Sequence, residues 1–247
     1  MKLSIIIPVF NEEKTIIPVL QKLILLQMPR HVQHEMLVVD DGSTDFTVSK
    51  IEEYIKNPSA KLRVKREKIL FYKHKKNAGK GAAIKTGIEK ATGDYIIIQD
   101  ADLEYNPKDI LTLLQEVISN KRDVVYGTRL KRLPHFNKEE KTGRFLLHYI
   151  GNRFLSFVTS ALYGQWITDM ETCYKLFPKS AAVRMHLLAK GFEFEPEITV
   201  KLIKAGYRIY EVPIQTKPRS YAEGKKLDAI RDGKKALWIL LKYRFVA

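Results

Sequence analysis

Short apolar runs alternate with stretches of helical periodicity through the first half of the chain. The apolar runs predict strands, and they read LSIIIPVF, EMLVVDD, ILFYKHK, DYIIIQDAD and DVVYGTRL. The segments between them predict helices, in Thr15 to Leu26, VSKIEEYI, GKGAAIKTGIEKA and NPKDILTLLQEVIS. In the last of these, Asn106 is the expected N-cap and Pro107 the first helical residue. This alternation predicts an α/β fold with a mostly parallel central sheet and helices on both faces.

The second half is less regular. An apolar, helix-compatible segment covers residues 144–163, and ETCYKLF is a short strand-like piece. A helix is expected through EPEITVKLIKAG, ending at Gly206, and YRIYEVPIQ is the last expected strand. The tail, residues 229–247, mixes Trp238 with lysines, which is typical of an amphipathic interfacial helix. We expect a main domain over 1–228 and this tail at a membrane surface, although both apolar helices could instead cover the sheet.

Three acids follow a buried strand at one point of the chain. Asp100, Asp102 and Glu104 come directly after the isoleucines of DYIIIQDAD. Alternate residues of an extended chain share a face, and like charges about 4 Å apart repel by about 4 kcal/mol near a protein surface. A cation should therefore lie among them, and hard oxygen ligands suit Mg²⁺ or Mn²⁺ shared with substrate phosphates. The alternative is a polar strand end in which Asp102 opens a turn.

A second polar pair follows another strand. Asp40 and Asp41 precede Gly42, so they either form a turn or accept hydrogen bonds from a base or ribose. Because ligands of such sheets bind at the carboxyl ends of strands, both acid clusters are expected at one rim. The segment NAGKGAA does not match a P-loop, and the chain has no G-x-G-x-x-G motif. Lys80 is either a phosphate ligand or a solvated lysine.

Charge and cysteine content narrow the classes of partner. The chain has 247 residues, a net charge of +15 and one cysteine, Cys173, which fits a packed thiol in a reducing compartment. The charge indicates a polyanionic partner: nucleic acid, an anionic membrane or a phosphorylated ligand. No stretch is apolar and long enough to span a bilayer, and MKLSIIIPVF resembles a first strand more than a signal peptide. A cytoplasmic location is expected.

An ordered set of motifs resembles one enzyme family. PVFNEE, VVDDGSTD, NAGKGAAIKTG, QDADLEY, VYGTR, TDMETCYK, FEFEPEI, EVPI and RSYAEGKK occur in the order typical of family 2 glycosyltransferases with the GT-A fold. The chain is most similar to polyprenyl-phosphate (dolichyl-phosphate) mannose and glucose synthases, from Lys2 to about residue 235. Each motif alone is weakly specific, whereas the set is specific for the family and much less so for the sugar or acceptor.

The resemblance implies a nucleotide-sugar site and a metal. The residues expected to bind the donor are Pro8, Phe10, Glu12, Asp40, Asp41, Lys80, Asp100 and Ala101. Asp100, Asp102 and Glu104 occupy the D-x-D-type motif that holds Mg²⁺ or Mn²⁺ in the family, with Asp102 the surest ligand. Many lipid-phosphate synthases carry Gln where this chain has Glu104, which adds negative charge here.

The resemblance also implies an acceptor site. Arg129 of the G-T-R motif, Arg144, Arg219 and Lys225 (with Lys226) are the expected ligands of an acceptor phosphate, and the expected catalytic set is Asp102, Arg129, Asp169 and Arg219. A lipid phosphate has a second pKa near 6, is largely dianionic at pH 7 and needs no catalytic base. A sugar hydroxyl would need one, and Asp169 or Glu171 would serve.

The expected reaction is the inverting transfer of mannose or glucose from GDP-mannose or UDP-glucose to a polyprenyl phosphate. The enzyme would work at the cytoplasmic face of the membrane as a peripheral protein. The first alternative is a soluble glycosyltransferase that acts on a sugar hydroxyl in glycan synthesis. The second is a nucleic-acid-binding protein, which the acids at the sheet rim disfavour because they would repel phosphates; we therefore expect no nucleic-acid partner.

Overall fold

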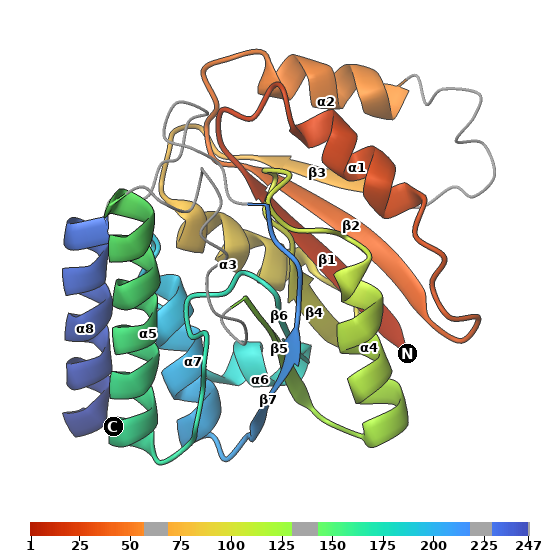
Figure 1. Ribbon diagram of the computed structural model, residues 1–247. Helices are drawn as coiled ribbons and strands as arrows, with labels where there is room; N and C mark the ends of the chain where they lie inside the picture. Colours follow the sequence, from red (N-terminus) through yellow and green to blue (C-terminus); the bar gives the residue numbers. More distant parts are fainter. Residues whose placement is uncertain (57–68, 130–142, 218–228, 247) are drawn as a thin grey trace.

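A seven-stranded sheet forms the centre of the computed structural model, which describes residues 1–56, 69–129, 143–217 and 229–246 (Figure 1). The strands are β1 (Lys2–Val9), β2 (Gln33–Asp40), β3 (Ile69–Lys73), β4 (Tyr95–Ile98), β5 (Val124–Thr128), β6 (Lys175–Pro178) and β7 (Ile209–Pro213). Each overlaps a run that the apolar pattern predicts as a strand, and β1, β2 and β6 extend one or two residues beyond their runs. These predictions are confirmed.

The strand order is β3-β2-β1-β4-β6-β5-β7. All neighbouring pairs are parallel except those of β6, which runs antiparallel to both β4 and β5. The expectation of a mostly parallel sheet is therefore confirmed. The direction of β6 could not be predicted, because a run of four residues carries no sign of which way its backbone pairs.

The described helices surround the sheet on both faces, as expected. They are α1 (Ile16–Ile24), α2 (Thr47–Lys56), α3 (Lys80–Lys90), α4 (Asp109–Asn120), α5 (Gly143–Tyr163), α6 (Lys179–Arg184), α7 (Phe194–Lys204) and α8 (Ala229–Phe245). In Figure 1, α1, α2 and α4 lie on one side of the sheet and α3, α6 and α7 on the other. Only the short α6 has no counterpart among the predicted helices.

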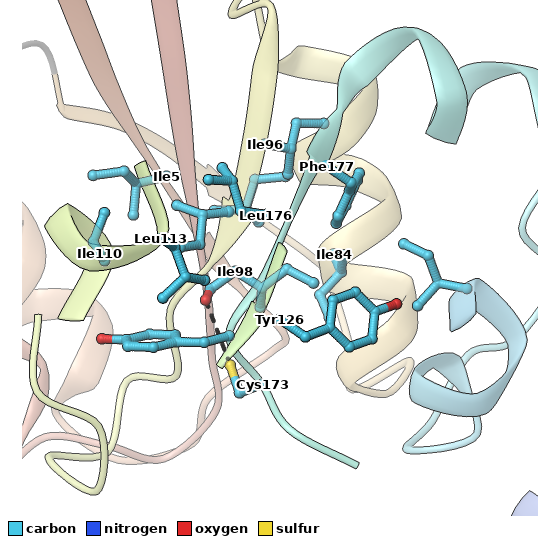
Figure 2. Close-up of a cluster of buried hydrophobic side chains, with 14 of the residues drawn as sticks. Ile5, Ile84, Ile96, Ile98, Ile110, Leu113, Tyr126, Cys173, Leu176 and Phe177 are labelled. Atoms are coloured by element: carbon cyan, nitrogen blue, oxygen red, sulfur yellow. Dashed lines mark hydrogen bonds between the residues drawn. The ribbon is translucent and has the colours of Figure 1, made fainter. Parts of the chain in front are cut away.

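The central strand β1 is buried on both faces, and its side chains alternate between them. Ile5 lies with Ile110 and Leu113 of α4 (Figure 2), so it faces that helix. Ile6 faces α3, where a Cβ added to Gly87 would lie 2.4 Å from its Cγ2. Helix α3 can therefore approach the sheet this closely only with glycine at position 87. This close packing fixes where α3 begins, which matters for the site below.

The predicted start of α4 is wrong by two residues. The helix begins at Asp109, and Asn106 does not cap it. Instead, the side-chain Oδ1 of Asn106 accepts a hydrogen bond from the Lys108 amide at 3.2 Å, and its carbonyl accepts one from Asp109 at 2.9 Å. Asn106 thus forms a local turn, the main competitor of capping for asparagine side chains. The predicted stop at Gly206 is confirmed, with its φ of +85° just after α7.

Helices α5 and α8 stand side by side as an outer layer next to α7 (Figure 1). The hydroxyl of Tyr163 donates to the Leu240 carbonyl at 2.6 Å, and that of Tyr243 donates to Glu197 of α7 at 2.7 Å. Each helix therefore has a packed face, as the covering alternative predicts. Their other faces expose large side chains, with Phe157 60% and Trp238 66% exposed. In the described part of the chain, no helix has the length and apolar content needed to cross a bilayer.

Candidate active site

A cavity of about 610 Å³ opens at the carboxyl ends of β1, β4 and β5. Its lining also includes the first residues of α3 and α7, residues 147–155 of α5 and residues 232–237 of α8. The strand-end rule for parallel sheets locates a ligand site at this rim. Most of the residues predicted to bind the donor or metal line it, as does Arg129, which was predicted to bind the acceptor phosphate: Pro8, Phe10, Glu12, Asp41, Lys80, Asp100, Ala101, Asp102 and Glu104.

The remaining predicted site residues are not among those that line the cavity. Asp40 and Asp169 are buried, and neither belongs to the cavity lining, although their sequence neighbours Asp41 and Glu171 do. Arg219, Lys225 and Lys226 lie outside the described residues, as does the side chain of Arg144. The roles predicted for these residues remain predictions.

The carboxylate of Asp41 fixes the loop that enters α3. It accepts hydrogen bonds from the amides of Ala78 at 3.0 Å and Gly79 at 2.7 Å, and its Oδ1 lies 2.7 Å from Nδ1 of His74. Gly79 has φ of +101°, and a Cβ there would lie 2.3 Å from the Lys190 carbonyl oxygen. Only glycine fits this crowded, left-handed position. The loop therefore delivers Lys80, the first residue of α3, to the cavity in a defined direction.

Asp40 combines a turn role with an unsatisfied atom. Its Oδ2 accepts the amides of Gly42 and Ser43, each at 3.1 Å, as the turn alternative predicts. Its Oδ1 is buried and accepts no hydrogen bond within the described structure. Leaving such an acceptor unpaired costs about 1–3 kcal/mol, so the atom is suited to a donor supplied by a ligand.

The cation expected among the acids of the rim is Lys80. Its Nζ lies 2.8 Å from Asp100 Oδ1 and 3.3 Å from Glu195 Oε1, and it stands 6.0 Å from the centre of the Phe192 ring. Burial opposes the charge of Lys80, but the attraction of Asp100 outweighs it and raises the lysine pKa. Burial likewise opposes ionisation of Asp100, and Lys80 again prevails and lowers the aspartate pKa. Both groups are therefore ionised at neutral pH.

The three acids after β4 do not share one face of an extended strand, and that expectation is corrected. The strand ends at Ile98, the chain then bends, and Asp102 Oδ1 accepts the Glu104 amide at 3.2 Å. Among the described residues, no three His, Cys, Asp or Glu side chains gather closely enough to hold a metal ion by themselves. The turn alternative for Asp102 is the one observed.

The donor set still suits a divalent ion that arrives with its substrate. Asp100, Asp102 and Glu104 all line the cavity and offer only hard oxygen ligands. Mg²⁺ is usually bound through one or two carboxylates together with substrate phosphates, so a complete protein cage is not required. Because Asp100 is paired with Lys80, Asp102 is the carboxylate best placed to contribute.

Arg129 is held rigidly by Asp169. The guanidinium Nε and Nη2 donate to the two carboxylate oxygens at 2.8 Å each, and the backbone amide of Arg129 donates to Oδ2 at 2.9 Å. Burial opposes the charge of Arg129, but Asp169 overcomes this and raises the pKa of the arginine. Glu211 fixes Asp169 in turn by accepting its backbone amide at 2.9 Å. Asp169 therefore orients Arg129, which lines the cavity.

A second charged cluster is connected to Lys80 through Glu195. Its members Lys175 and Glu195 were not predicted from the sequence. Lys175 of β6 is completely buried, and its Nζ lies 2.5 Å from Glu195 Oε2 and 2.9 Å from the Met170 carbonyl. Glu171 and Glu195 both line the cavity, and each has a buried Oε1 that accepts no hydrogen bond in the described structure. A lysine inside an apolar strand was the available signal, because a buried lysine needs a carboxylate partner.

Helices α5 and α8 provide the longest apolar part of the cavity lining. Helix α5 contributes Leu147, Phe154 and Leu155 beside the polar His148 and Asn152, and α8 contributes Leu237 beside Asp232 and Lys234. Two glycines, Gly151 of α5 and Gly233 of α8, also line this end, and a Cβ on either would meet nothing within 4 Å. The cavity therefore joins a charged rim to an apolar wall with room beside it.

Comparison with known proteins agrees with this architecture. The model of glycosyl transferase family 2 matches residues 4–184. The chain is 33% identical over 221 residues to a UDP-N-acetylglucosamine–dolichyl-phosphate N-acetylglucosaminyltransferase of Methanococcus voltae, covering 86% of this chain and 84% of that one. It is 26% identical over 225 residues to a dodecaprenyl-phosphate galacturonate synthase of Rhizobium johnstonii, covering 91% of this chain and 62% of that protein.

Solved structures show the same fold at low sequence identity. A glucosyl-3-phosphoglycerate synthase from Mycobacterium tuberculosis, in complex with Mn²⁺, uridine diphosphate and phosphoglyceric acid, superposes with a TM-score of 0.69 at 17% identity, covering 100% of this chain and 79% of that one. TarS of S. aureus in complex with UDP-GlcNAc gives a TM-score of 0.61 at 16% identity, covering 98% of this chain and 66% of that one. The family match over most of the chain and the fold of these neighbours lead to one conclusion: the chain belongs to glycosyl transferase family 2 and is a glycosyltransferase with the GT-A fold.

Proposed function

We propose that the protein transfers a hexose, with inversion, from a nucleotide diphosphate sugar to a polyprenyl phosphate. The two-ended cavity carries this proposal, because a charged rim fits phosphates and an apolar wall fits an isoprenoid chain. The names of the relatives from Methanococcus voltae and Rhizobium johnstonii, which are polyprenyl-phosphate sugar transferases, support the same acceptor class. Mannose, glucose and N-acetylglucosamine are all candidates for the sugar.

The donor binds at the rim in this proposal. Pro8 and Phe10 line the nucleotide side, and Asp40 supports it from behind the lining by accepting the amides of Gly42 and Ser43. Lys80 lies next to the diphosphate, where its charge offsets that of the phosphate oxygens. Asp102, with the diphosphate oxygens, would hold Mg²⁺ or Mn²⁺. When bound, the ion stabilises negative charge on the departing nucleotide diphosphate.

The acceptor phosphate binds against Arg129. A guanidinium held in a fixed orientation can present its remaining N–H groups to phosphate oxygens, and this pre-organisation lowers the cost of binding. Asp169, one of the two bases expected for a hydroxyl acceptor, is buried, paired with Arg129 and absent from the cavity lining. It is therefore unsuited to act as the base that a hydroxyl nucleophile needs.

The exposed faces of α5 and α8 provide the proposed membrane contact. Trp238, Leu241 and Phe245 of α8 recur at helical spacing and are exposed, and Arg231 and Lys234 are exposed on the same side. Apolar side chains mixed with cations suit an anionic membrane surface, where each cation contributes about 1 kcal/mol. A peripheral position at the cytoplasmic leaflet would bring the lipid phosphate to the apolar end of the cavity.

A transfer assay tests the proposal directly. The protein is incubated with polyprenyl phosphate in anionic vesicles, Mn²⁺ and a panel of labelled nucleotide sugars that includes UDP-GlcNAc, UDP-glucose and GDP-mannose. Label should enter the lipid with one of them, and polyprenol without phosphate should accept none. Transfer to polyprenol, or to a soluble glycan but not to the lipid phosphate, would contradict the proposed acceptor.

Vesicle sedimentation tests the membrane contact separately. Truncating α8 would be uninformative, because Ala236, Leu240 and Tyr243 are buried and hold the helix in place. Trp238→Ser and Phe245→Ser change only exposed side chains and should lower the vesicle-bound fraction several-fold, with no change in Tm. Unchanged sedimentation would show that these faces have another use.

A further inference from the structure

Two carboxylates whose Oε1 atoms are buried from solvent lie in the lining of the cavity. Glu171 lies two residues after Asp169, and Glu195 lies in the first turn of α7. Oε1 of Glu171 accepts no hydrogen bond in the described structure. Glu195 is only 3% exposed, and its Oε1 meets one cation, Nζ of Lys80, at 3.3 Å without a well-formed hydrogen bond.

The charged groups around Glu171 include as many cations as anions. The cations that act on it are Lys175 and Arg129, and the anions are Glu195 and Asp169. Arg129 is already used by Asp169, and Lys175 by Glu195 and by the Met170 and Thr172 carbonyls. Burial dominates, and it raises the pKa of Glu171 to about 7. The fold therefore buries a carboxylate, which disfavours its ionised form, and provides no hydrogen-bond donor to its Oε1.

Such unsatisfied groups persist where a ligand satisfies them. Resting on the proposed function, we propose that Glu171 and Glu195 bind the donor sugar, and that their Oε1 atoms accept hydrogen bonds from hydroxyl groups of an uncharged hexose. Lys80 supports this position, because it bridges Glu195 to the phosphate end of the site at Asp100. A sugar bonded to the diphosphate therefore lies within reach of both glutamates.

The pair also selects against acidic sugars. A uronic acid donor carries a carboxylate of its own, and this would meet two further carboxylates, while Lys80 and Arg129 serve the donor and acceptor phosphates in the proposed function. Like charges placed together in this way exclude the wrong ligand more effectively than a missing contact does. The site is accordingly specific for neutral hexoses, with or without an acetamido group, whose N–H can also donate.

The test is a coupling measurement between protein and sugar. Calorimetry in the presence of Mn²⁺ gives the affinity of wild type and Glu171→Ala for the nucleotide hexose of the panel that binds wild type most tightly, and for its monodeoxy analogues. Hydrogen bonds to charged groups are worth about 10- to 100-fold in affinity, so removing one particular hydroxyl should cost wild type that much. In Glu171→Ala, removing the same hydroxyl should lower the affinity by less than about threefold, because the carboxylate that accepts its hydrogen bond is already absent.

Matched variants separate sugar binding from structural support. Glu193→Gln is the control, because Glu193 also has a buried Oε2 without a hydrogen bond but does not line the cavity. It should leave every affinity within about twofold of wild type. Glu195→Gln should show the same reduced dependence of affinity on a second hydroxyl of the sugar. Its Tm shows how far the lost ion pair with Lys175 destabilises the fold. Glu171→Gln should also improve binding of a uronic acid donor relative to the neutral one.

The outcomes distinguish this inference from the proposed function. If removing each hydroxyl lowers the affinity equally in wild type and Glu171→Ala, the sugar contact is overturned, even if lipid-phosphate transfer is observed. Coupling without any transfer to polyprenyl phosphate would uphold the sugar contact and reject the acceptor. If no nucleotide hexose binds in the presence of Mn²⁺, both are rejected. A loss of affinity for the nucleoside diphosphate alone in Glu171→Ala would show that the residue is only structural.

Discussion

The two ends of the cavity are built on opposite principles. At the rim, charged side chains are paired with one another at short distances, as Lys80 is with Asp100 and Arg129 with Asp169. At the wall, α5 and α8 present apolar side chains and two glycines with open space in front of them. The rim is pre-organised and electrostatic, whereas the wall is roomy and unspecific. A cavity of this kind suits a ligand with a phosphate at one end and a hydrocarbon chain at the other.

The two ion pairs of the rim also differ from each other. Arg129 and Asp169 are joined by two side-chain hydrogen bonds and a backbone one, so the pair is fixed before any ligand arrives. Lys80 meets Asp100 and Glu195 through single ion pairs from a flexible stem. We infer that Arg129 works from a fixed position, while Lys80 can exchange a carboxylate for a phosphate.

The largest effect is expected from Asp102. Asp102→Ala removes the carboxylate best placed to hold a divalent ion and should lower kcat by roughly 10³-fold or more. The fold should be unaffected, because the side chain lines the cavity at a turn. Asp123→Ala, a change just before β5 and outside the cavity lining, is the matched control. Transfer at the wild-type rate by Asp102→Ala in Mn²⁺ would mean that the metal contribution has been misassigned.

The second-largest effect is expected from Arg129, and it tests whether this residue serves the acceptor and not the donor. Arg129→Lys keeps the charge but cannot form the two-pronged bond to Asp169, so the cation loses its fixed orientation. We expect kcat/KM for polyprenyl phosphate to fall by roughly 10²-fold, because a small misplacement near the reacting groups costs about that much. Affinity for the nucleoside diphosphate, measured by calorimetry, should stay within a few-fold. An equal loss at both ligands would place Arg129 at the donor.

The wall is tested by filling its open space. Gly151→Leu places a side chain in front of the apolar end and should raise the KM for a long polyprenyl phosphate by about tenfold, with donor affinity unchanged. Misfolding cannot explain such a result, because leucine is favoured over glycine in a helix interior by roughly 0.8 kcal/mol. Ala161→Leu, at an exposed position of α5 outside the cavity lining, is the control. If Gly151→Leu leaves the KM unchanged, the hydrocarbon chain does not pass this glycine.

The sequence predicts the rim better than it predicts the contacts within it. Strand ends are local features, so apolar runs followed by Asp41, Asp100 or Arg129 are enough to place these residues at one edge of a parallel sheet. The partners of those residues are not local. Asp169 lies forty positions after Arg129, and only the antiparallel insertion of β6 between β4 and β5 brings its segment alongside. Periodicity contains no information about such pairings.

The same limit explains the metal prediction and the wall. Alternation places Asp100, Asp102 and Glu104 on one face only if the strand continues, and the side chain of Asp102 instead stabilises a bend. The required cation is a lysine from α3, about twenty residues earlier in the sequence, and nothing near the acids indicates it. The amphipathic character of α5 and α8 is visible in the sequence, but their packing against one another is a tertiary property.

The smallest expected effect comes from pH, and it reports on the sugar position between the two ends. Burial raises the pKa of Glu171 to about 7 in the protein without ligand. A sugar hydroxyl that donates to the carboxylate favours its ionised form, so donor binding should release a proton and strengthen as pH rises through 7. Between pH 6 and pH 8 we expect the affinity for the nucleotide hexose to increase by about fivefold in calorimetry.

The comparison that isolates this effect is Glu171→Gln with the same nucleotide hexose. Glutamine does not titrate, so the part of the pH dependence that belongs to Glu171 should vanish, while contributions from other groups remain in both proteins. Glu171→Gln should also be more stable than wild type at pH 8 but not at pH 5, because only the ionised carboxylate is costly to bury. An affinity that falls as pH rises would mean that protonated Glu171 binds the sugar by donating. Identical pH profiles for the two proteins would separate Glu171 from the sugar altogether, and the neutral-hexose selectivity would then depend on Glu195 alone.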